Sequence, residues 1–371
     1  MPATFITAGK IITGCKGLEA VGKECAALGR HCLIVTGTNA MKRAGITDRV
    51  VSLLTKEGVA ATVFAGVAGE PTVKEVDAGR KVCRENQCDV VVGLGGGSAM
   101  DAAKVVAGLA FEEEPTEVFL EGKGIGARGL PFVAIPTTSG TGTEVTPNSV
   151  ITNPRTVEKK SIRSLLFVAR VAIVDPELAL SAPPAVTAYT GMDALTQAIE
   201  SYVSIHATPI TEALSFEAAR RIAYSLPIAF RDGSNIAART DMAYGSLMAG
   251  MALANARLGV VHGIAHPLGA RYHIPHGLVC AVLLPQAMRL NAEAASEKFA
   301  RLSQMLGKDV VAFVEELSAA LGIPETLKDY KVRPEDFPAI VKESMPSGSL
   351  KANPKKVTES DVEMILREVA R

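Results

Sequence analysis

The chain has 371 residues, of which 48% are hydrophobic and 21% are charged; these proportions are typical of a globular protein with a sizeable core, and the length suggests two domains. Its 39 lysine and arginine residues balance 39 aspartate and glutamate residues, which argues against a nucleic acid or an anionic membrane as partner. The sequence contains no apolar run of about 18 residues that would predict a transmembrane helix, and its start lacks the pattern of a signal peptide. Six cysteines without a CxxC pair predict reduced, buried thiols in a cytoplasmic protein.

Short β-rich runs alternate with helical patterns in the first half of the chain. The pattern predicts helices at 72–87 and 98–110, and strands at 31–37, 60–66, 89–96, 130–136 and 171–176. Strands that are separated by helices predict a parallel sheet with both faces covered. Residues 3–14 alternate enough to predict an edge strand that pairs across a dimer.

The β-rich runs stop after residue 186, and long helical patterns, several of them rich in alanine, continue to the end of the chain. We therefore expect two domains. Residues 1–180 are predicted to form an α/β dinucleotide-binding domain, and residues 181–371 an all-helical domain that holds metal and substrate.

A run of three glycines, Gly95, Gly96 and Gly97, lies between a predicted strand and a predicted helix and is followed by Ser98. Glycines let a ligand approach the backbone closely, and the start of a helix offers free N–H groups to an anion, so a pyrophosphate is the expected ligand. Ser98 stands where the GxGxxG fingerprint has its third glycine, which argues against the common Rossmann loop. Ser98 is expected to cap the helix, and Asp101 to lie in its first turn. A tight turn without a ligand would need one glycine.

Four of the six histidines, His262, His266, His273 and His276, lie within fifteen residues. His262 and His266 are four residues apart and share a face if the segment is helical. Imidazole is the commonest metal ligand and a frequent proton shuttle. Upstream, Asp193 and Gln197 show the same spacing. The alternative is a set of buried or capping histidines without a metal.

The segments GMDALTQAIESYVS and GVVHGIAHPLGARYHIPHG together resemble the iron-containing alcohol dehydrogenase family, and the resemblance extends over essentially the whole chain. It implies the dehydroquinate synthase-like fold. It also implies an enzyme that interconverts an alcohol and its aldehyde or ketone by hydride transfer with NAD(P), assisted by a divalent metal, with a small molecule as substrate.

The resemblance implies that Asp193, Gln197, His262 and His276 bind the metal, Fe²⁺ or else Zn²⁺. The family has a histidine where Gln197 stands, and an amide oxygen is a weaker donor than imidazole. Asp193, His262 and His276 still form a set of two histidines and one carboxylate, which suits a divalent ion with open positions. Weaker affinity, an altered choice of metal and metal-free operation all stay open. The set contains no thiolate, which argues against a structural cysteine–zinc site.

The resemblance assigns further roles. Gly95, Gly96, Gly97 and Ser98 match the family's GGGS motif. Thr138, Thr141 and Lys159 match cofactor contacts, with Lys160 as a near alternative to Lys159, and His266 matches a histidine of the active site. Gly37 stands where NAD-preferring relatives carry an acid, which favours NADP, whereas Glu70 near the dinucleotide argues in the opposite direction, so NAD stays open.

Three alternatives remain. A metal-independent reductase of the same superfamily is favoured by Gln197 alone. A lyase of the dehydroquinate synthase type needs a basic cluster for a phosphate-bearing substrate, and the segment 187–285 offers mainly Arg257 and Arg271. A nucleotide-binding regulator would not need the histidines.

Overall fold

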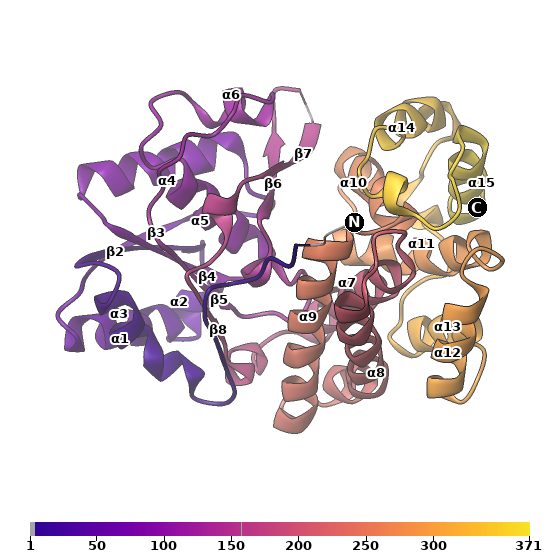
Figure 1. Ribbon diagram of the computed structural model, residues 1–371, viewed down its shortest axis with the longest axis horizontal. Helices are drawn as coiled ribbons and strands as arrows, with labels where there is room; N and C mark the ends of the chain where they lie inside the picture. The colour runs from indigo at the N-terminus through magenta and orange to yellow at the C-terminus, as the bar shows by residue number, and fades with distance from the viewer. Residues whose placement is uncertain (1–3, 157) are drawn as a thin grey trace. The chain divides into compact units, whose positions relative to one another are not determined.

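The computed structural model describes residues 4–156 and 158–371. Within them the chain forms two compact units. An α/β unit contains Phe5–Thr138 and Gly142–Ala182, and a helical unit contains Pro183–Arg371 together with Ser139–Thr141 (Figure 1).

The α/β unit is built on a six-stranded sheet in the order β1-β8-β5-β4-β2-β3, in which every strand pair is parallel. The strands are β1 (Ile11–Thr13), β2 (His31–Gly37), β3 (Ala60–Val67), β4 (Val90–Gly95), β5 (Phe132–Pro136) and β8 (Val171–Val174). The predicted parallel sheet is confirmed. Residue 3, the first of the predicted N-terminal strand, lies outside the described residues, and the strand itself is the short edge strand β1, paired with β8.

Helices cover both faces of this sheet (Figure 1), because its strands are apolar on both sides. On one face, Ile34 and Val92 pack with Val21 and Leu54 from the helical segments. On the other face, a Cβ at Gly93 would lie 2.9 Å from the Cβ of Ala103, so this glycine lets the next helix pack closely on β4. The helices of the unit are α1 (Val21–Ala26), α2 (Ala40–Arg43), α3 (Ile46–Lys56), α4 (Val73–Glu85), α5 (Gly97–Gly108) and α6 (Thr116–Leu120).

An antiparallel hairpin of β6 (Asn148–Asn153) and β7 (Glu158–Arg163) also belongs to this unit. This hairpin lies outside the predicted strands, because β6 and β7 carry mostly polar residues and lack the apolar run of a buried strand. Only alternate residues of β6 are fully buried, as in a strand with one covered face.

The helical unit has one apolar core, to which all of its long helices contribute. Helices α7, α8 and α9 pack against one another, and α11 packs against α7. The helices are α7 (Pro184–Val203), α8 (Pro209–Arg231), α9 (Ile236–Ala256), α10 (Val260–Tyr272), α11 (His276–Leu290), α12 (Ser296–Leu306), α13 (Val310–Ala320), α14 (Phe337–Ser344) and α15 (Glu359–Val369).

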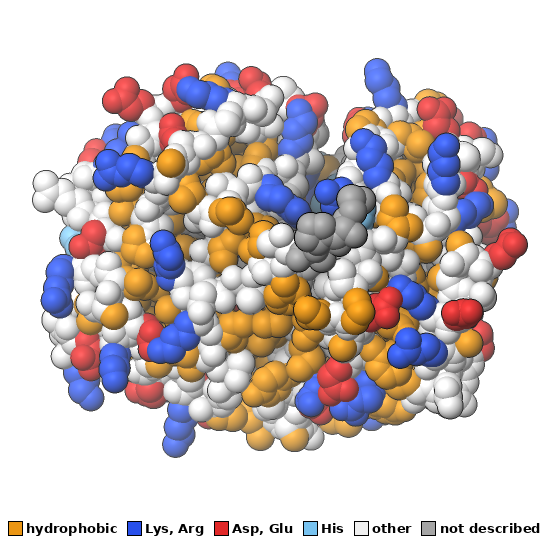
Figure 2. Space-filling model, viewed as in Figure 1, with side chains coloured by type: hydrophobic (Ala, Val, Ile, Leu, Met, Phe, Trp, Pro, Cys, Tyr) orange, Lys and Arg blue, Asp and Glu red, His pale blue; other side chains and the backbone are white. Residues whose placement is uncertain are grey.

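No single helix among the described residues is long and apolar enough to span a bilayer. Helices α9 and α10 pass that test only as a pair bent by 102°, and both contribute buried side chains to the core of the helical unit. On the face drawn in Figure 2, lysine and arginine side chains are interspersed with aspartate and glutamate, in keeping with the net charge of zero.

Candidate active site

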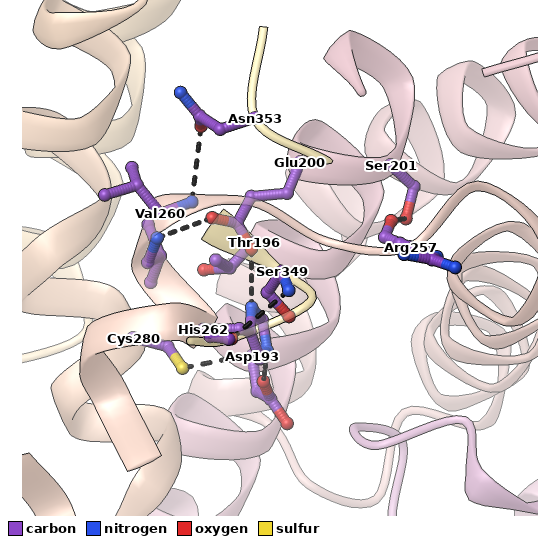
Figure 3. A network of polar contacts seen from close by, with 12 residues as sticks. Asp193, Thr196, Glu200, Ser201, Arg257, Val260, His262, Cys280, Ser349 and Asn353 are labelled. Carbon is purple, nitrogen blue, oxygen red and sulfur yellow. Dashed lines mark hydrogen bonds and ion pairs between the residues drawn. The ribbon is translucent and has the colours of Figure 1, made fainter. Parts of the chain in front are cut away.

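The start of α10 is fixed by two side chains from other parts of the helical unit (Figure 3). The backbone N–H of Val261 donates to Oε1 of Glu200 at 2.6 Å, and that of Val260 donates to Oδ1 of Asn353 at 3.2 Å. The first N–H groups of a helix lack partners within the helix, and its N-terminus favours negative charge. Glu200 and Asn353 therefore determine where α10 begins and how His262 is presented.

His262 lies between two carboxylates. Its Nδ1 lies 2.6 Å from Oε2 of Glu200 and its Nε2 lies 3.2 Å from Oδ1 of Asp193. With the Nδ1 proton donated to Glu200, the Nε2 lone pair faces Asp193, which is the arrangement that a metal-bound histidine adopts. Burial lowers the pKa of His262, but Cys280, Asp193 and Glu200 together outweigh it and hold this pKa well above its usual value. The site therefore favours a cation beside Nε2.

Helix α11 brings a second histidine to the same place. His276 is its first residue, directly after Pro275, and its Nε2 lies 3.8 Å from Oδ1 of Asp193. A Cβ at Gly277 would lie 2.0 Å from the backbone oxygen of Tyr189 in α7. Only glycine lets α11 start this close to α7, so the position of His276 beside Asp193 depends on Gly277.

Cys280 lies one turn after His276 on α11 and is fully buried. Its Sγ lies 3.6 Å from Nε2 of His276 and 3.9 Å from Nε2 of His262. Burial raises the pKa of the thiol to about 11, although the nearby His262 opposes this rise.

Asp193, His262, His276 and Cys280 each offer a ligand atom, and these four atoms lie within 4.8 Å of one another (Figure 3 labels three of them). All are buried except His276, whose side chain is 25% exposed. A carboxylate, two imidazoles and a thiol at this spacing fit a divalent metal. The structure thus brings together three of the four predicted ligands.

Gln197, the fourth predicted ligand, is buried one turn after Asp193 on α7. Its Oε1 has no hydrogen-bond partner among the described residues. A buried amide oxygen without a partner costs free energy unless a ligand satisfies it.

The expectation that no thiol lies among the ligand positions is wrong, because Cys280 lies in the cluster. The sequence does contain a signal for Cys280, because it follows His276 by four residues, as Gln197 follows Asp193. Residues four apart share a helix face. Glu200 was also missed, although it lies seven residues after Asp193 on the same face of α7.

The remaining histidines of the segment differ in their surroundings. The ring of His266 is half-buried, and its centroid lies 5.2 Å from that of His276 and 6.4 Å from that of His262. His266 is therefore next to the cluster, and its contact with substrate stays a prediction. His273 is exposed and ends α10 in the left-handed conformation.

The glycine loop lies between β4 and α5, as predicted. Gly95 has a φ of 150°, which L side chains rarely adopt, and Gly96 precedes the helix in an extended conformation. A Cβ at Gly96 would lie 3.4 Å from Oγ1 of Thr138, so the structure brings Thr138 beside the loop. The free N–H groups at the start of α5 (Gly97 and Ser98 onward) are suited to an anion.

Two expectations about this loop are corrected. The residue that precedes α5 is Gly96, so Ser98 lies inside the first turn and does not cap the helix. Asp101 accepts hydrogen bonds from Oγ1 of Thr143 at 2.6 Å and from the backbone N–H of Val150 at 2.9 Å. Asp101 lies beyond the first turn of α5, and this turn contains no acidic residue. It fixes the segment after β5 instead.

The other predicted cofactor residues lie on three different segments. Lys159, on β7, forms an ion pair with Glu70. Gly37 ends β2. Among the described residues, a Cβ there would meet only the backbone oxygen of Val67, at 3.6 Å, so a side chain fits. Thr141 lies in the Ser139–Thr141 segment and is half-buried.

Two family models match nearly the whole chain. Residues 8–176 match the iron-containing alcohol dehydrogenase model, and residues 187–370 match that of the C-terminal part of the Fe-containing alcohol dehydrogenase family. The chain belongs to the iron-containing alcohol dehydrogenase family. The resemblance drawn from the two motifs is confirmed.

Individual relatives of this iron-containing alcohol dehydrogenase match most of its length. It is 39% identical over 370 residues to a 1,3-propanediol dehydrogenase of Klebsiella pneumoniae, covering 96% of this chain and 95% of the relative. It is 36% identical over 324 residues to an NADPH-dependent butanol dehydrogenase of Clostridium saccharobutylicum, covering 83% and 82%. A solved structure of a 1,3-propanediol oxidoreductase superposes with a TM-score of 0.95 at 37% identity and covers 100% of both chains.

The predicted activity follows from this membership. The chain is an NAD(P)-dependent alcohol dehydrogenase that interconverts an alcohol and its aldehyde or ketone, and the family uses a divalent metal together with the dinucleotide.

Proposed function

We propose that this alcohol dehydrogenase reduces an aldehyde to a primary alcohol with NADPH, and catalyses the reverse oxidation, at a divalent metal held by Asp193, His262 and His276. The convergence of these three side chains, two of them buried, is the observation that carries the proposal. When bound, the metal supplies a Lewis acid that polarises the carbonyl oxygen. Hydride transfer itself is the chemistry of the nicotinamide.

The chain's own residues orient and protect this site. Glu200 holds the Nδ1 proton of His262, so that Nε2 stays available as a ligand. His266, beside His276, is proposed to contact the substrate or to relay the alcohol proton. Gln197 is proposed as an additional, weak oxygen donor, which its unpartnered Oε1 supports.

We assign dinucleotide binding to residues 1–180 and metal and substrate binding to residues 181–371. Gly95, Gly96, Gly97 and Ser98 are proposed to hold the pyrophosphate, with contacts from Thr138, Thr141 and Lys159.

The preference for NADP rests on Gly37, which leaves space and no negative charge at the end of β2. The exposed Lys42 and Arg43 follow closely in the chain. Glu70, which argues against a 2′-phosphate, has its charge balanced by Lys159. The NADPH dependence of the Clostridium relative agrees with this preference.

The substrate is proposed to be a primary alcohol, because the relatives' names specify 1,3-propanediol, butanol and long-chain alcohols. We also propose that the enzyme works in the cytoplasm as a homodimer, without nucleic acid or membrane as partner.

The test is purification without chelators, metal analysis by mass spectrometry, and assays of aldehyde reduction with NADPH and NADH before and after exhaustive chelation. We expect a bound divalent ion, loss of turnover on chelation, and recovery on adding metal back. His262→Ala should lose both metal and turnover, whereas His273→Asn, an exposed position whose left-handed backbone suits asparagine, should lose neither.

The presence of Gln197, where the family has a metal-binding histidine, favours an alternative function. This alternative is a metal-independent reductase of the same superfamily. If a metal acts here, Gln197→His should slow its loss during dialysis, because imidazole is a better donor than an amide. Full activity after chelation, with no metal detected, would establish the metal-independent reductase instead.

A further inference from the structure

The metal cluster contains one ligand atom for which the family resemblance gives no role. Sγ of Cys280 lies closer to Nε2 of His276, at 3.6 Å, than Asp193 does, at 3.8 Å. Cys280 is the only cysteine after residue 88 of the sequence, and its side chain is fully buried among the ligand atoms. We infer that Cys280 is the fourth metal ligand and takes the place left by Gln197, giving a site that selects Zn²⁺ over Fe²⁺.

The distances between the ligand atoms fit a tetrahedral ion. With Zn–N at 2.0–2.1 Å and Zn–S at 2.3 Å, a nitrogen and a sulfur ligand lie about 3.6 Å apart, and a nitrogen and an oxygen about 3.4 Å. The two sulfur–nitrogen distances here are 3.6 and 3.9 Å, and the two nitrogen–oxygen distances are 3.2 and 3.8 Å. Small side-chain movements therefore bring all four atoms onto one ion.

The donor types point to the same metal. A thiolate with two imidazoles and a carboxylate is a softer set than oxygen and nitrogen alone, and soft ligands favour zinc. A bound metal displaces the proton of the Cys280 thiol to solvent. Asp193 and the resulting thiolate then supply two negative charges, which balance a divalent ion in a buried site. Gln197 supplies none, and its neutral amide is the weaker donor.

A buried cysteine commonly serves as a small apolar side chain without any metal, which is the alternative role for Cys280. Cys280 differs from such a residue, because its sulfur lies near three other ligand atoms. These belong to Asp193 on α7, His262 on α10 and His276 on α11. A cysteine with a purely apolar role would be surrounded by carbon atoms. The inference rests on the proposed function in taking a metal at Asp193, His262 and His276.

The experiment is titration of the metal-free enzyme with Co²⁺, a spectroscopic substitute for zinc. Sulfur coordination produces a charge-transfer absorption in the near ultraviolet that oxygen and nitrogen ligands do not produce. We expect one Co²⁺ per wild-type chain with this band. In Cys280→Ser the band should vanish and the affinity for Co²⁺ should fall by at least about tenfold. Loss of a residue that only hydrogen-bonds to a metal ligand already lowers metal affinity by that much. Gln197→Ala should keep the band, with affinity changed less than in Cys280→Ser, and Cys15→Ser, at an exposed thiol, should match the wild type.

Competition between Zn²⁺ and Fe²⁺ under anaerobic conditions gives the metal preference, and Cys280→Ser should reduce the preference for zinc. If Cys280→Ser does not fold, the charge-transfer band is measured in two other variants. Its loss in His262→Ala and its retention in Cys15→Ser would show that the coordinating sulfur belongs to this cluster. Among the described residues, Cys280 is the cysteine in the cluster. One Co²⁺ per chain without the band, or a band that persists in Cys280→Ser, overturns the role of Cys280 and leaves the proposed function standing. No Co²⁺ binding by the wild type overturns both.

Discussion

Glu200 and His262 form a buried pair in which Oε2 of the carboxylate lies 2.6 Å from Nδ1 of the imidazole. The other oxygen of Glu200 accepts the backbone N–H of Val261, so one carboxylate fixes both the ring and the helix turn that carries it. The metal-facing nitrogen of His262 is consequently held toward Asp193 before any metal binds.

The first prediction concerns this pair. Glu200→Gln keeps the size of the side chain but removes its charge, so His262 should lose both its fixed tautomer and part of its basicity. We expect metal affinity to fall by about 10- to 100-fold, measured by competition with a chromophoric chelator. Glu217→Gln, a carboxylate on α8 that pairs with arginines, is the matched control and should leave affinity unchanged. Equal affinity in Glu200→Gln and wild type would show that Glu200 does not orient the ligand.

The second prediction concerns the glycine loop. Gly96→Val places side-chain bulk between α5 and Thr138, where the pyrophosphate is proposed to lie. Binding of NADPH and NADH, followed by fluorescence titration, should be severely weakened in a variant that keeps its far-ultraviolet circular dichroism. Gly124→Val, where an added Cβ meets no atom of the described residues within 4 Å, should bind like the wild type. Unchanged affinity in a folded Gly96→Val protein would remove the loop from the cofactor site.

The third prediction concerns cofactor choice. Gly37→Asp adds a carboxylate at the end of β2, where space allows it. Its repulsion of a 2′-phosphate should cost about 1–3 kcal/mol, a factor of roughly 5 to 150. The measurement is kcat/KM for NADPH and for NADH in the same variant, with NADH as the internal control. A ratio that does not move would refute the assignment of Gly37 to the ribose end of the dinucleotide.

The fourth prediction concerns stability. Burial raises the pKa of Glu144 from 4.5 to about 7, although the nearby Lys104 opposes the rise. The protonated form is thus favoured in the folded state, and the stability that it contributes below pH 4.5 is lost as the pH rises through 7. The amide in Glu144→Gln does not ionise, so this variant does not lose stability in this way. The difference in free energy of unfolding between Glu144→Gln and wild type should therefore increase by about 3 kcal/mol in favour of the variant between pH 4.5 and 7, since one pKa unit corresponds to about 1.4 kcal/mol.

Denaturant unfolding of Glu144→Gln and wild type between pH 4 and 8 measures this difference. The exposed Glu113→Gln should show a constant offset from wild type over the same range. A constant offset for Glu144→Gln as well would mean that folding does not raise the pKa of Glu144.

The parallel sheet could be predicted from the sequence because its strands are buried on both faces and read as continuous apolar runs, as in β2 and β4. The hairpin of β6 and β7 could not, because its stability comes from cross-strand pairing and one covered face, and polar residues such as those of β7 leave little apolar signal.

The amino-acid sequence by itself determined the family, the glycine loop and the segments that carry Asp193, His262 and His276, because these depend on residue type and local spacing. Only the tertiary structure decided that Glu200 orients His262 and that Cys280 lies among the ligand atoms. These contacts join α7, α10 and α11, whose cluster residues Asp193 and Cys280 are 87 positions apart in the sequence, and local spacing cannot specify which faces of three helices meet. Packing decides it, as at Gly277, where the missing side chain lets α11 lie against the backbone of α7.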